Sequence, residues 1–231
     1  RSHPVVAAQP SHRLAGDHRD RAGRGLIVDG VVAPELAGPL RALQRPDREL
    51  AMRLVTPDGI ARVSVVRQGN QIVTARRIHN DIELRVLAGE ADLAAATTVL
   101  IAELPQAQAA QITPVGAPLH EMSERLSGNY DAMKLADGIR ALGADTKTAM
   151  LLGSALASRE AFAEIVYYAL SVDDDRIVQA PAAVGIFYTK RGRIVGSPKP
   201  QTADEFASEN LVRDCLFEGG GRLLPSSVGI W

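Results

Sequence analysis

Cysteine and aromatic residues are scarce in this chain. Cys215 is the only cysteine among 231 residues, so no internal disulfide can form. A lone thiol is typical of a protein from a reducing compartment, which predicts a cytoplasmic location. Aromatic residues account for 4% of the chain, so the core must be built from Ala, Val, Leu and Ile.

The chain also lacks an excess of one charge and a long apolar segment. Its formal net charge is -1, which excludes the general basic field that attracts nucleic acid. No apolar run approaches the roughly 20 residues of a membrane-spanning helix, and no signal peptide is visible. We therefore expect neither a nucleic-acid partner nor insertion into a membrane. Because the sequence begins at Arg1 and not at a methionine, we also expect that its start is missing.

The motifs of common catalytic and metal sites are incomplete. His120 and Glu121 begin the helical zinc-protease motif, but Glu124 occupies the position of its second histidine. Ser154 and Ser197 each follow a glycine without completing the Gly-x-Ser-x-Gly turn of a serine hydrolase. The other candidates match no ligand or phosphate-binding spacing; they are His3, His12, His18 and the glycine run 219–221. We therefore predict no catalysis, no metal and no cofactor.

The strongest structural pattern lies in residues 49–87. Apolar residues alternate with polar ones in four short runs, which is the period of a strand with one buried face. Typical turn residues separate these runs at Pro57-Asp58-Gly59, Gly69-Asn70 and Asn80-Asp81. Because turns this short can join only antiparallel strands, the stretch predicts a four-stranded antiparallel meander.

The same order of elements recurs in the second half of the chain. In the first half, expected helices over 34–44 and 91–104 flank the meander. In the second half, expected helices flank a set of strands; the helices cover 146–157 and 210–224, and the strands cover 161–170, 182–189 and 193–197. A repeat of long period indicates a duplicated architecture. The prediction is an α+β fold with two lobes related by a quasi-two-fold axis, each an antiparallel meander sheet packed with helices. The expected lobes are residues 1–105 and 119–231, joined by a linker over 106–118.

Several short sequence motifs occur in an order that is typical of one protein family. They are His3-Pro4-Val5, 25–30, 40–54 around Arg45-Pro46-Asp47, 63–74 with Arg67-Gln68-Gly69, 183–198 with Gly192-Arg193-Ile194-Val195, and 211–231 with Leu224-Pro225 and Trp231. This set resembles the EspG family, the cytosolic chaperones of actinobacterial type VII (ESX) secretion, and it extends over nearly the whole chain from His3. The resemblance implies a pair of quasi-two-fold lobes, each a sheet with helices, in agreement with the repeat. This chain departs from the family in three ways: the opening strand is missing, the turn at Pro57 is much shorter than the long loop of some members, and the glycine run 219–221 is unusual.

The resemblance also implies a function. Members of the family bind PE–PPE heterodimers, gripping the apolar tip of the PPE helical bundle and keeping it soluble before export. We expect the partner to dock on the second sheet and the closing helix, where the apolar cluster consists of Leu211, Val212, Leu216 and Phe217. The second expected contact is the turn formed by Thr56, Pro57, Asp58 and Gly59. A different class of function stays open, a small-molecule enzyme or sensor on a two-lobed sheet, which would need a concave pocket with convergent polar groups.

Overall fold

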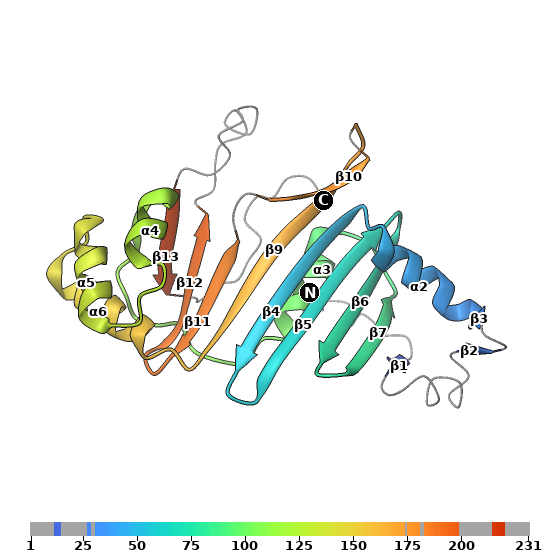
Figure 1. Cartoon of the computed structure of the whole chain (residues 1–231), viewed down its shortest axis with the longest axis horizontal. Coiled ribbons are helices and arrows are strands. Elements are labelled where there is room, and N and C mark those ends of the chain that lie inside the picture. The colour runs from blue at the N-terminus through green and yellow to red at the C-terminus, as the bar shows by residue number, and fades with distance from the viewer. Residues whose placement is uncertain are drawn as a thin grey trace, which may run out of the picture.

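One large sheet organises the molecule (Figure 1). The computed structural model describes residues 12–14, 27–28, 31–173, 175–180, 183–198 and 214–219. The sheet has 11 strands, and its main path runs β1 (His12–Leu14), β7 (Asp81–Leu87), β6 (Gln71–Ile78), β5 (Gly59–Gln68), β4 (Arg48–Thr56), β9 (Ala161–Ser171), β11 (Val184–Thr189), β12 (Gly192–Pro198), β13 (Asp214–Gly219) and β8 (Val115–Pro118). The strand off this path is β10 (Arg176–Gln179), which pairs with β9, and a separate ribbon joins β2 (Ile27–Val28) to β3 (Val31–Val32).

Strands β4 to β7 form the predicted meander. Each neighbouring pair is antiparallel, and two residues separate each strand from the next. Gly69 and His79 adopt positive φ angles of 56° and 51° in the second and third turns, a conformation that tight hairpin turns require. The third turn therefore lies at His79-Asn80, one residue before the expected position.

A second antiparallel meander, formed by β9, β11, β12 and β13, continues the same sheet. β4 and β9 join the two meanders as an antiparallel pair, from Arg48 opposite Ala169 to Val55 opposite Phe162. In each half the first strand returns to the last, so that β1 pairs with β7 and β8 pairs with β13. Each half therefore has the same arrangement from its edge inward: its first strand, then its last strand, then the remaining strands in reverse order of sequence. The α+β class is confirmed, and the two repeated halves share one continuous sheet.

The closing segment differs from its prediction. The helix expected over 210–224 is wrong, because residues Asp214–Gly219 form β13 between β12 and β8. Leu211 and Val212 lie outside the described residues. The pattern of apolar residues in this segment fits either period over so short a length, and pairing with two distant strands decides for the sheet.

The segment expected as a linker takes part in the sheet. Its last residues, Val115–Pro118, form β8. Ala109 forms a parallel bridge with Arg193, and the N–H of Arg193 donates to the carbonyl of Gln108 at 2.7 Å. The lobe boundaries at residues 105 and 119 stay a prediction.

Five helices belong to the described part of the chain, and they are α2 (Pro34–Gln44), α3 (Leu93–Ala102), α4 (Leu119–Leu126), α5 (Ala132–Ala141) and α6 (Thr146–Ala157). Asp92, Asp131 and Asp145 begin three of them, and each side chain accepts a backbone N–H three residues on, as N-cap residues do. Asp145 also accepts the Thr148 hydroxyl at 2.6 Å, and these hydrogen bonds lower the pKa of its carboxyl.

Helices cover both faces of the sheet (Figure 1, where α2 lies in front of it and α3 behind). On one face, Leu100 of α3 belongs to the core cluster around Val65. On the opposite face, Ala42 of α2 packs with Val66, and α5 and α6 pack with Ile194. The helices on this second face stand over the two ends of the sheet, so part of its centre remains open.

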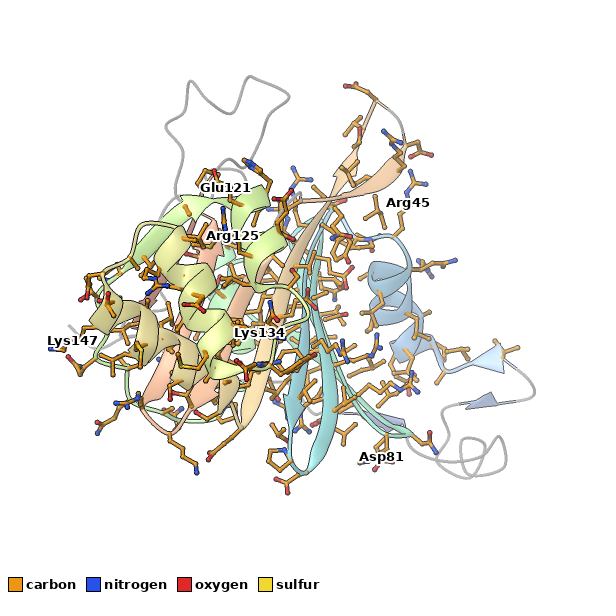
Figure 2. The ribbon with its side chains drawn as sticks, turned by 60° about the vertical axis from the view of Figure 1, so that its left-hand side comes forward. Arg45, Asp81, Glu121, Arg125, Lys134 and Lys147 are labelled. Carbon is orange, nitrogen blue, oxygen red and sulfur yellow. The ribbon has the colours of Figure 1, made fainter. Side chains whose placement is uncertain are left out.

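The strand β10 was not predicted, and it extends an arm at one end of the sheet. The arm exposes Val172, Ile177 and Val178. Asp175 near its tip forms an ion pair with Arg45, which follows α2 and lies at the opposite end of the strands from Asp81 (Figure 2). The arm is thus tied to the first half of the chain.

Candidate functional site

The β4–β5 turn is a predicted contact that the structure describes fully. Thr56 and Gly59 are paired at the ends of the two strands, and Pro57 and Asp58 are exposed between them. The Thr56 hydroxyl donates to the Gly59 carbonyl at 3.4 Å. Gly59 has a φ of 136°, and a Cβ there would lie 3.5 Å from the His79 ring. The turn is therefore short, closed by its own hydrogen bond, and packed against the third turn of the meander, which contains His79.

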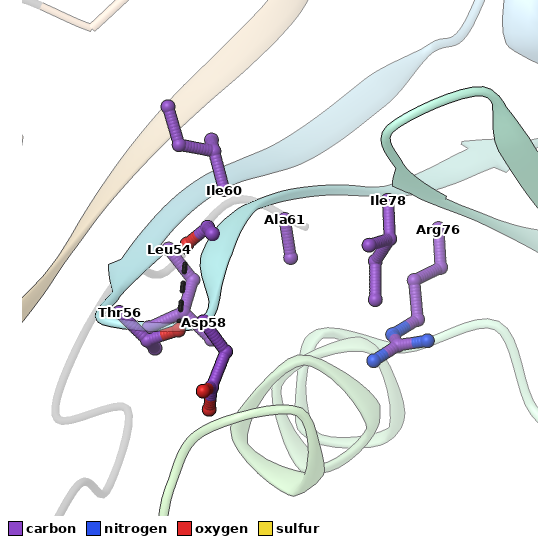
Figure 3. Close-up of a pocket in the computed structure, with 8 residues that line it drawn as sticks. Leu54, Thr56, Asp58, Ile60, Ala61, Arg76 and Ile78 are labelled. Carbon is purple, nitrogen blue, oxygen red and sulfur yellow. Dashed lines mark hydrogen bonds between the residues drawn. The ribbon is translucent and has the colours of Figure 1, made fainter.

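A pocket of about 250 Å³ lies beside this turn (Figure 3). Its walls come from β4, β5 and β6, and the lining residues are Leu54, Thr56, Asp58, Gly59, Ile60, Ala61, Arg76 and Ile78. Three of the four predicted turn residues thus share one hollow, whose walls are mostly apolar. Small-molecule sites usually measure about 300–1,000 Å³, so this pocket is small for a ligand.

Arg76, the basic residue in the pocket lining, already forms an ion pair. Arg76 Nε lies 2.7 Å from Glu103 Oε2, and Glu103 is the residue at the C-terminal end of α3. The ion pair joins the sheet to the helix that covers it. The other charged residue in the lining, Asp58, is exposed.

The other face of the same hairpin is open to solvent. Ile60 points away from the remaining pocket residues (Figure 3) and is 45% exposed. It lies opposite Val55, which in turn lies opposite Phe162. The Arg53 guanidinium stands 5.9 Å from the centre of the Phe162 ring. We refer to this surface, defined by Arg53, Val55, Ile60, Phe162 and Arg62, as the open sheet face.

Exposed apolar side chains on and just before α5 lie near one end of the open sheet face. Tyr130 and Met133 are 70% and 58% exposed, and they come just before and within α5. The Arg159 guanidinium lies 4.8 Å from the centre of the Tyr130 ring. Because Arg159 comes two residues before β9, this contact places Tyr130 near the start of that strand. Only the register of the sheet and the packing of α5 reveal this grouping.

The second predicted contact set is only partly described. Leu216 and Phe217 lie on β13, whereas Leu211 and Val212 fall outside the described residues. Three strands, β9, β11 and β12, separate β4 from β13. At about 4.8 Å between neighbouring strands, the two strands are roughly 19 Å apart. The structure therefore does not bring the two predicted contacts side by side, and a single partner surface would have to span both.

The described ranges contain no group of three His, Cys, Asp or Glu side chains arranged to hold a metal. In the same part of the chain, no helix is both long and apolar enough to cross a membrane. His120 and Ser154 lie on different helices, α4 and α6. The described residues present an exposed turn and an open sheet face, on which apolar and charged side chains lie together.

The sequence and the fold are similar to those of known proteins. The sequence matches the family model described as the EspG family over residues 14–207. The ESX-5 secretion-associated protein EspG5 of Mycobacterium marinum (strain ATCC BAA-535 / M) is 26% identical over 205 residues, covering 78% of this chain and 68% of the relative. The protein of the same name from Mycobacterium tuberculosis (strain ATCC 25618 / H37Rv) is 25% identical over the same shares of the two chains.

A solved structure shares the fold. It is the type VII secretion system chaperone EspG5 of Mycobacterium tuberculosis in complex with the PE25-PPE41 dimer. The TM-score is 0.70 at 20% sequence identity, and the match covers 87% of this chain and 78% of that chain. At this identity the likeness is one of architecture.

Proposed function

This chain belongs to the EspG family, and on that premise we propose that it is a chaperone of type VII secretion that binds a PE–PPE heterodimer. In this proposal it acts in the cytoplasm, covers the apolar tip of the PPE protein and keeps the pair soluble until export. The observation that carries the proposal is the family match over residues 14–207. The fold supports it, because a chaperone of the same architecture has been solved with a PE–PPE dimer bound. The function needs binding alone, so no catalytic step is proposed.

The described surface has the properties that such binding requires. A protein–protein contact combines an apolar centre with a polar rim. Ile60 and the half-buried Phe162 supply apolar area on the open sheet face, and Asp58 at the turn supplies a charged margin. We propose that the partner contacts the turn Thr56–Gly59 together with this face. We propose a second contact on the closing segment, at Leu211, Val212, Leu216 and Phe217.

A binding measurement tests this function. The chain, purified without a tag, is titrated with a panel of PE–PPE heterodimers, and at least one pair should bind with a 1:1:1 stoichiometry. In a typical interface a few buried anchors supply most of the binding free energy. Ile60→Asp and Phe217→Asp should therefore each weaken binding by about 2–4 kcal/mol, or roughly thirty-fold to a thousand-fold.

Val172→Asp is the matched control, because Val172 is 86% exposed on the arm formed by β9 and β10. It should leave affinity unchanged. Circular dichroism must show that each variant is folded. A folded Ile60→Asp protein with full affinity removes the open sheet face from the contact, and a folded Phe217→Asp protein with full affinity removes the closing segment.

A small-molecule sensor is the second candidate, and the pocket beside the turn is the observation in its favour. The pocket is a weak candidate, because its volume is only about 250 Å³ and its arginine, Arg76, is already paired with Glu103. A metabolite that raises the melting temperature of the wild type but not of Ile78→Trp, which would fill the pocket, would favour this function over the first.

A further inference from the structure

Three arginines form a row across neighbouring strands at the open sheet face. Arg62 on β5 lies directly opposite Arg77 on β6 and directly opposite Arg53 on β4. Residues opposite each other in a sheet project from the same face, so all three side chains share the face that carries Ile60. All three are exposed. On the far side of Arg53, Glu164 of β9 ends the row with the opposite charge.

This arrangement costs stability in the free protein. Like charges directly opposite each other in antiparallel strands are destabilising, and Arg62 has an arginine on both sides. Among the described residues, none of the four ion pairs includes any of these three arginines. Arg77 is held through its Nε, which donates to the His79 carbonyl at 2.9 Å, and Arg53 is held over the Phe162 ring. The side chains of Arg53 and Arg77 are therefore held in place, while the three arginines together keep an excess of positive charge.

The spacing of the row matches an α-helix. Two strand spacings separate Arg53 from Arg77, which is about 10 Å. Side chains at positions i and i+7 of a helix lie about 10.5 Å apart, with an i+3 or i+4 residue between them. Alternate residues of an extended strand would need about 13 Å for the same three contacts. A helix laid across the strands could thus present one carboxylate to each arginine, and guanidinium groups bind carboxylates through paired hydrogen bonds.

We propose that the row formed by Arg53, Arg62 and Arg77 receives an acidic stripe, with one carboxylate per turn, on a helix of the protein partner. The proposal deepens the proposed function and rests on it for the identity of the partner. The neighbouring Val55, Ile60 and Phe162 provide the apolar contact beside the stripe. Helix α2 does not obstruct the row, because it packs against Val66, four residues or about 13 Å further along β5. Three cations on a chain with a formal net charge of -1 are too few for a nucleic-acid surface.

The test replaces all three arginines of the row with glutamine and measures affinity for the PE–PPE pair that binds the wild type. A control variant removes the same charge from exposed helical arginines elsewhere, Arg41, Arg125 and Arg140. The row variant should bind roughly 3-fold to 100-fold more weakly, as expected for the loss of three exposed ion pairs. Its affinity should also depend less on ionic strength, and its melting temperature should equal or exceed that of the wild type. The control variant should bind as the wild type does.

Equal affinity of the row variant and the wild type, or equal losses in the row and control variants, would overturn the proposal. If no PE–PPE pair binds the wild type, the proposed function fails, and the row is tested alone with a helical peptide that carries glutamates at i, i+4 and i+7. Chemical-shift changes in β4, β5 and β6 that a charge-scrambled peptide does not cause would support the acidic stripe. The absence of such changes, or displacement of the peptide by single-stranded DNA, would refute it.

Discussion

The contact between α5 and α6 depends on a missing side chain at Gly153. A Cβ at this position would lie 2.6 Å from the backbone N of Ala136 and 2.8 Å from the carbonyl O of Ala132. Both atoms belong to the backbone of α5, so relief requires the two helices to move apart. Overpacking usually costs about 1–3 kcal/mol and occasionally more; because both clashing atoms belong to the backbone, we take about 2–4 kcal/mol here, and alanine in a helix interior regains about 1 kcal/mol relative to glycine. Gly153→Ala should therefore lower the free energy of unfolding by about 1–3 kcal/mol.

Thermal unfolding followed by circular dichroism measures this change. For a chain of this size the loss corresponds to a melting temperature lower by about 2–12 °C. Ser154→Ala is the control, because Ser154 is the next residue of α6 and is exposed; the higher helix propensity of alanine should raise the melting temperature slightly. If Gly153→Ala melts at or above the wild-type temperature, α5 and α6 do not approach as closely as described.

Two further predictions concern the core and one helix cap. Val65→Asp should lower the free energy of unfolding by roughly 3 kcal/mol or more, since Val65 is 0% exposed and the carboxylate of the new aspartate would have no partner. Leu54→Asp should lower it by a similar amount, and Ile165→Asp by less because Ile165 is only half-buried. Equal urea midpoints for all three variants and the wild type would contradict the core assignment. Asp145→Asn should lower the melting temperature near neutral pH. Because hydrogen bonds from Thr148 lower the pKa of the Asp145 carboxyl in the folded state, its contribution is present above the unfolded pKa and is lost as the pH falls through the folded pKa. The gap between wild type and variant should therefore shrink below about pH 4, and a gap that widens there would contradict the cap.

Elements with strong local signals could be predicted from the sequence. The helix Pro34–Gln44 has the predicted bounds, with a proline at its first turn where the missing N–H has no cost. The meander was predictable because its turns contain residues such as Pro57, Asp58 and Gly69, whose backbone preferences are local. Asp145 directly precedes the predicted helix 146–157, and aspartate is a typical N-cap residue; its side chain accepts the expected N–H.

Elements that depend on distant pairing could not be predicted. β8 has four residues in a segment with little pattern, and only its pairing with β13 makes it a strand. β13 was predicted as a helix for the same reason, since its partners are far away in the sequence. The union of the two meanders through β4 and β9 is likewise a contact between residues more than 100 positions apart, such as Val55 and Phe162.

The candidate site was predictable in part for the same reason. The turn Thr56–Gly59 was visible because turn chemistry is local. Ile60, by contrast, is an ordinary alternating residue until the sheet shows which face remains uncovered. The row of Arg53, Arg62 and Arg77 requires the register of three strands, which no spacing along the chain reveals.

The most direct test of the proposed chaperone function is the mass of the complex it forms. The chain is co-expressed with PE–PPE pairs, purified through a tag on the PE protein, and measured by native mass spectrometry. We expect, for at least one pair, a species that contains one copy of this chain, one PE protein and one PPE protein, and we expect the PPE protein to precipitate when this chain is left out. PE–PPE pairs that are soluble without this chain and that never retain it would show that the chain is not their chaperone.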